Sequence, residues 1–103
     1  MKLEVTSGEI GLKIGSVITK EQLLALKAEG YNNVIVPVYA TVNMGCRMNT
    51  GNDWGTTFTG GQWTDLTWDI DKYAGYMGSD NAVMFRFTGT GTAYLGSVSV
   101  IKG

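Results

Sequence analysis

Residues 34–48 alternate between two kinds of side chain with a period of two. One parity is apolar throughout and comprises Val34, Val36, Val38, Ala40, Val42, Met44, Cys46 and Met48. The other parity carries Tyr39, Thr41, Asn43 and Arg47. Because successive residues of a β-strand point to opposite faces, the segment is predicted to be β-structure with one face in a core. Pro37 has no N–H and predicts a sheet edge or a bulge, and Gly45 predicts a division into two strands.

Further strands are predicted within residues 2–6, 9–15, 60–70, 81–89 and 92–103 from the same alternation. In the fourth of these, Val83, Phe85 and Phe87 are expected to face inward, with Ala82, Met84 and Arg86 outward. In the last, Leu95 and Val98 are three residues apart, so Gly96 predicts a bulge.

One helix is predicted in the segment that runs from Thr19 to Gly30. Thr19 can cap its start, and Gln22 three residues later completes a capping box. Gly30 suits the left-handed position after the last turn. We expect this helix to close one end of a β core.

The composition fits one all-β domain spanning residues 1–103. Fifteen glycines and one proline indicate many tight turns. Together with the alternating segments they predict an antiparallel two-sheet β-sandwich with one short α-helix. Net charge is −1 with the basic residues dispersed, so no nucleic-acid or membrane partner is expected. Cys46 is the single cysteine and is predicted to be a buried free thiol.

Catalysis has little support in the residue types present. The chain has no histidine, which removes the usual triads and the ordinary zinc sites. Asp65 and Asp69 share a face but would lie about 13 Å apart at strand rise, beyond the roughly 5 to 9.5 Å that glycosidases use. We expect no enzyme activity, no cofactor and no metal ligands, while a structural calcium ion is left open.

The three tryptophans occur between residues 54 and 68. Trp54 has no apolar neighbour and is predicted to lie in a loop. Trp63 shares its parity with Asp65, so it is placed on the outer face, because burying the carboxylates would be costly. Trp68 shares its parity with Leu66 and is assigned to the core if no bulge intervenes. Since a bulge would reverse this assignment, Trp68 is kept among the candidate ligand residues.

Exposed tryptophan suggests recognition, and an indole face can stack on the C–H face of a sugar ring. Neighbouring polar side chains could bond to the sugar hydroxyls. The candidate ligand-binding residues are therefore Trp54, Trp63, Trp68, Tyr39, Asn43, Arg47, Asn49, Asn52, Asp53, Gln62 and Asp65.

Most of the chain resembles the small β-sandwich carbohydrate-binding modules of bacterial, cellulosomal-type plant-cell-wall hydrolases. The resemblance rests on the opening strands, "TKEQLLALKAEGYNNVIVPV", "GGQWTDLTWDID" and "TAYLGSVSV". It implies a jelly-roll fold and the leading tryptophan of such modules at Trp63, with a second binding aromatic at Trp54. Gly96 stands where related modules often have an acidic residue, which argues against calcium.

The resemblance also implies a function. The ligand would be a β-1,4-glucan or β-mannan chain such as glucomannan, xyloglucan or mixed-linkage β-glucan. The module would be an extracellular, monomeric part of a larger polypeptide and would hold its glycoside hydrolase on substrate. The main alternative is a structural or protein-binding β-sandwich of a bacterial surface protein, and a very small hydrolase is a second one.

Overall fold

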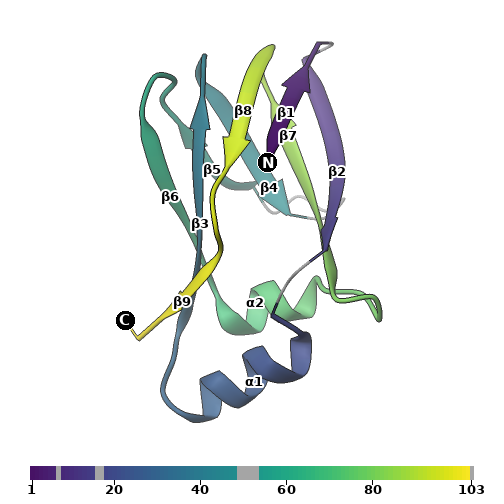
Figure 1. The fold of residues 1–103 in the computed structure, drawn as a ribbon, viewed down its shortest axis with the longest axis vertical. Helices are drawn as coiled ribbons and strands as arrows, with labels where there is room; N and C mark the ends of the chain where they lie inside the picture. Colours follow the sequence, from purple (N-terminus) through teal and green to yellow (C-terminus); the bar gives the residue numbers. More distant parts are fainter. Residues whose placement is uncertain (7, 16–17, 49–53, 103) are drawn as a thin grey trace.

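The computed structural model describes residues 1–6, 8–15, 18–48 and 54–102, with only the backbone described at 12, 48 and 54–56. The described chain forms nine strands and two helices (Figure 1). In order these are β1 (Lys2–Val5), β2 (Glu9–Gly15), α1 (Lys20–Ala28), β3 (Asn33–Ala40), β4 (Met44–Met48), β5 (Trp54–Phe58), β6 (Trp63–Asp69), α2 (Ile70–Gly75), β7 (Ala82–Thr88), β8 (Gly91–Leu95) and β9 (Ser99–Ile101).

The strands form two antiparallel sheets that face each other. One sheet has the order β1-β8-β3-β6, with β9 also paired to β3, and the other has the order β2-β7-β4-β5. Strand β1 pairs with β8, β2 with β7, β3 with β6 and β4 with β5. The chain is thus a long hairpin wound into two layers, which is jelly-roll topology. The predicted all-β sandwich is confirmed.

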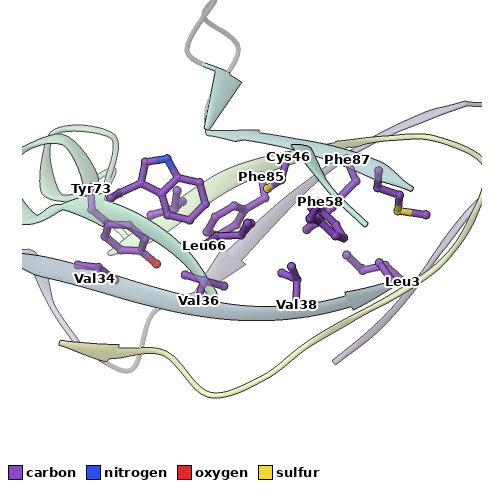
Figure 2. Packing of buried hydrophobic residues seen from close by; sticks show 14 of the residues in the cluster. Leu3, Val34, Val36, Val38, Cys46, Phe58, Leu66, Tyr73, Phe85 and Phe87 are labelled. Atoms are coloured by element: carbon purple, nitrogen blue, oxygen red, sulfur yellow. The ribbon is translucent and has the colours of Figure 1, made fainter. Parts of the chain in front are cut away.

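The core lies between the sheets and is built from the parities that the sequence predicts (Figure 2). Val34, Val36 and Val38 of β3 are all buried, and so are Val83, Phe85 and Phe87 of β7. Cys46 is buried as a free thiol, as predicted. Ala82 was expected to face outward but is buried, because β7 begins beneath the end of the sandwich that the helices cover.

Helix α1 begins and ends as the sequence predicts. The backbone N–H of Gln22 donates to Oγ1 of Thr19, and the Thr19 N–H donates to Oε1 of Gln22, which completes the capping box. Gly30 has a φ of +101°, the left-handed conformation expected after the last turn. The helix covers one end of the sandwich (Figure 1), and neither described helix is long and apolar enough to cross a membrane.

A second helix, α2, was not predicted, and its first residue, Ile70, was assigned to the preceding strand. Asp69 ends β6 and caps the helix by accepting from the Lys72 N–H at 2.8 Å. The turn that follows buries Ile70, Tyr73 and Ala74. The two helices together close the end of the core (Figure 1).

The chain changes sheets between Ala40 and Met44. The division into two strands is therefore at residues 41–43, not at Gly45. Val42, predicted to be in the core, is 38% exposed in this corner. The parity pattern failed here because a corner rotates the chain, so residues before and after it face different surfaces.

Pro37 lies in an interior strand, at the place where the neighbouring strand is interrupted. Strand β8 pairs with β3 from Val38 onward, and β9 pairs with it from Ile35 backward. Between them the Gly96 N–H donates to the Pro37 carbonyl at 2.8 Å. Pro37, which has no N–H to donate, thus lies opposite the irregular segment predicted at Gly96.

Candidate functional site

Three aromatic side chains form a row across the outer face of the β1-β8-β3-β6 sheet. Tyr39 of β3 lies directly opposite Trp63 of β6 on one side and Tyr94 of β8 on the other. We call Trp63, Tyr39 and Tyr94 the aromatic row. Since the partners in each pair occupy equivalent register positions, their side chains emerge on the same face.

The rings of the aromatic row contact one another and remain open to solvent. The centroids of Tyr39 and Trp63 are 5.7 Å apart with the planes at 49°, and those of Tyr39 and Tyr94 are 6.2 Å apart at 56°. Trp63 is 59% exposed and Tyr94 36% exposed. These are the separations of favourable tilted aromatic pairs, so the row holds itself in place while leaving ring surface uncovered.

Gly96, directly after β8, lies beside Trp63 and Pro37. A Cβ added at Gly96 would lie 3.6 Å from Cζ3 of Trp63 and 3.2 Å from Cβ of Pro37. The crowding is tight against Pro37, whereas the distance to Trp63 is that of an ordinary contact. Gly96 belongs to the same interruption between β8 and β9 that accommodates Pro37.

Polar and charged groups border the aromatic row. Asp65 is exposed two residues beyond Trp63 on the same face, and Gln62 is exposed in the turn before β6. At the other end, Lys2 of β1 lies opposite Tyr94 in register and forms an ion pair with Glu4 at 3.6 Å. Hydrogen-bonding groups are thus present at both ends of an apolar strip.

Trp68 does not belong to this surface. It is 5% exposed and packs against Tyr73 and Phe85, with ring centroids 6.4 and 5.7 Å away. The core assignment from its parity is confirmed, and its place among the ligand-binding candidates was wrong. No bulge intervenes between Trp63 and Trp68, as their register with β3 shows.

Arg47 lies on the opposite outer face of the sandwich, so its predicted grouping with Tyr39 was wrong. The change of sheet at the corner separates them. Arg47 and Arg86 both bond to Oε1 of Glu9, at 3.4 and 2.7 Å. The hydrogen bond from Arg86 lowers the pKa of the Glu9 carboxyl below its ordinary value.

Asn43 has a structural role that the sequence did not predict. Its Oδ1 accepts from the Gly60 N–H at 2.9 Å, which joins the corner after β3 to the turn before β6. Gly60 is required there, since a Cβ would lie 2.4 Å from the carbonyl carbon of Val42. The side-chain oxygen of Asn43 is therefore used to hold the corner in place.

Four candidates between residues 49 and 54 do not join the aromatic row in the described structure. Asn49, Asn52 and Asp53 lie outside the described residues. Trp54 was predicted in a loop, but its backbone begins strand β5 and pairs with Arg47. That register places residue 54 in the sheet opposite the aromatic row.

Tyr94 is the member of the row that the sequence analysis missed. It alternates with buried Ala93 on β8, so its outward direction could be read from parity. Its place beside Tyr39 could not be read from the sequence. Strands β3 and β8 are far apart in the chain, and only their pairing brings the two tyrosines together.

The described residues provide no obvious reactive centre. Burial raises the pKa of the Cys46 thiol to about 12, so it remains protonated. The Asp69 carboxylate caps α2. Within the described ranges, no group of three or more histidine, cysteine, aspartate or glutamate side chains could hold a metal ion.

Comparison of the sequence with protein-family models found no match, and neither did comparison with curated proteins.

Proposed function

We propose that this domain is a non-catalytic carbohydrate-binding module for neutral β-1,4-glucan or β-mannan chains, and that it holds a linked glycoside hydrolase on plant cell-wall polysaccharide. The observation that carries the proposal is the aromatic row, with Trp63 59% exposed beside Tyr39 and Tyr94. A tryptophan so exposed on a sheet face adds nothing to the core, whereas it is well suited to a ligand.

Stacking explains why sugars fit such a row. The C–H groups on one face of a pyranose ring are weakly positive, and the face of an aromatic ring is negative. Contact also removes apolar surface of both partners from water. Adjacent strands lie about 4.8 Å apart, so a row that crosses β6, β3 and β8 presents successive rings to an extended chain.

The tilt of the rings favours a solvated chain over a crystalline surface. Neighbouring planes differ by 49° and 56°, so the three rings cannot lie flat on one plane. A soluble chain can turn successive sugar units to follow them. The bordering Asp65, Gln62 and the Lys2–Glu4 pair can then bond to hydroxyl groups at the rim of the strip.

The charges favour a neutral ligand. Asp65 lies two residues from Trp63 on the same face. At the other end of the row, Lys2 is paired with Glu4, and the terminal ammonium of Met1 donates to the Leu95 carbonyl. A polyuronate would meet the Asp65 carboxylate without a basic groove to offset the repulsion. Neutral glucans and mannans have no such cost.

Affinity electrophoresis and fluorescence titration against glucomannan, xyloglucan and barley β-glucan test the proposal. We expect retardation by at least one of these and a shift in tryptophan emission. The affinity should change little between low salt and about 0.5 M salt, where the Debye length is roughly 4 Å. Binding to none of the polysaccharides, or binding that is lost in salt, would favour the alternative of a structural or protein-binding domain.

A further inference from the structure

A cavity of about 370 Å³ opens between the two sheets. Its rim is formed by Ile14 of β2, Leu95 of β8 and Val98 in the segment before β9. Its deeper wall includes Val36, Tyr73 and Phe85. The lining is mainly apolar, and the volume lies within the range of small-molecule sites.

Tyr73 gives this cavity a polar group that nothing in the described protein uses. The side chain is 3% exposed, and no hydrogen bond joins its hydroxyl to any described residue. Figure 2 shows the hydroxyl pointing from α2 toward β3 near Val36, which is also part of the cavity wall. The fully buried polar atoms without a partner among the described side chains are Arg47 Nε, Trp68 Nε1 and Arg86 Nε, so the Tyr73 hydroxyl is open to the cavity and can bond to a molecule that enters it.

The cavity wall combines the Tyr73 hydroxyl with the hydrocarbon of Val36 and Phe85, and Ser97 adds a second hydroxyl to the lining. Burial raises the pKa of Tyr73 to about 12, so the phenol stays protonated and can donate. The rings of Tyr73 and Phe85, 6.4 Å apart at 53°, form a corner into which a third ring can pack.

We infer that this cavity binds a small molecule that has one aromatic ring and one hydrogen-bond-accepting oxygen. The ring packs between Phe85, Val36 and Val98, and the oxygen accepts from the Tyr73 hydroxyl. The cavity lies between the sheets and the aromatic row lies on the outer face, and Gly96 is in contact range of both.

Acetophenone and ethylbenzene form a matched pair of probes, because only the ketone can accept a hydrogen bond. Methyl-resolved NMR titrations of the whole domain should show saturable shifts of Ile14, Val36 and Val98. Acetophenone should bind more tightly than ethylbenzene. Tyr73→Phe should lower the affinity for acetophenone by about three- to tenfold, the effect of one hydrogen bond, and leave that for ethylbenzene unchanged.

Tyr94→Phe is the control, because it removes a phenol from the outer face and should leave both affinities unchanged. Val98→Trp should fill the rim and abolish the methyl shifts of Ile14 and Val36 while the domain stays folded. The inference is overturned if neither probe gives saturable shifts at these methyl groups. It is also overturned if folded Tyr73→Phe binds acetophenone as the unmodified chain does.

Discussion

Tyr39 and Trp63 face each other across the β3–β6 pair, with ring centroids 5.7 Å apart, although they are 24 residues apart in the chain. The contact fixes the tilt of the indole and leaves most of its surface open to solvent. Tyr39 also contacts Tyr94, so it is the central member of the aromatic row. The position of Trp63 thus depends on the register of three strands.

Replacement of Trp63 by alanine should weaken polysaccharide binding severely and leave the fold intact. The expected loss is about 2 kcal/mol or more, as at interface hot spots, or roughly thirtyfold in affinity. Titration with the best-binding polysaccharide measures it, and circular dichroism checks the fold. Trp63→Phe, which retains a ring, should lose less. An unchanged affinity in folded Trp63→Ala would refute the assignment of the site.

Replacement of Trp68 by alanine should instead reduce stability. The side chain packs between Tyr73 and Phe85, so its removal leaves a cavity costing about 3–5 kcal/mol. Chemical denaturation gives the free energy of unfolding. Trp68→Phe should cost less, because it keeps an aromatic ring and removes a buried Nε1–H that has no hydrogen-bond partner. A normal melting temperature with lost binding would contradict the core placement.

Gly96→Ala should destabilise the domain by about 1–3 kcal/mol. The new Cβ would lie 3.2 Å from Cβ of Pro37, which a rigid ring in an interior strand cannot relieve. Gly75→Ala is the matched control, since nothing lies within 4 Å of its added Cβ. In a helix that change should be neutral or stabilising by up to about 1 kcal/mol. Equal melting temperatures for the two variants would exclude the proposed crowding.

Cys46 should resist thiol reagents at pH 8 until the domain unfolds. Burial raises its pKa from 9.0 to about 12, so the folded protein holds a proton that the unfolded chain releases. Stability from this group is complete below about pH 9 and declines as the pH rises toward 12. Denaturation from pH 8 to 10.5 should show a shallower decline in Cys46→Ala. Rapid labelling of the folded domain would contradict this expectation.

Much of the fold could be predicted because it depends on local patterns. The alternation in β3 predicted which of its residues face the core. Thr19 and Gln22 predicted the start of α1, and Gly30 predicted its end. The corner after Ala40 could not be read, since alternation gives a parity but no sign that the chain has changed sheets.

The candidate site was only partly predictable for a related reason. The outward direction of Trp63 follows from the carboxylates on its own strand. The residues beside Trp63 depend on how β6 pairs with β3 and how β3 pairs with β8. Local sequence does not encode these pairings. Arg47 was misplaced, and Tyr94 was missed, because both depend on which strands become neighbours.

The wound hairpin has a consequence for how the aromatic row comes into being. Tyr39 comes from the first half of the hairpin, and Trp63 and Tyr94 come from the second. The row is complete only after β8, one of the last strands of the chain, has joined β3. Such long-range pairing is slow compared with the formation of local structure. The environment of Trp63 therefore reports completion of the folding reaction, and any ligand of the row selects fully assembled molecules.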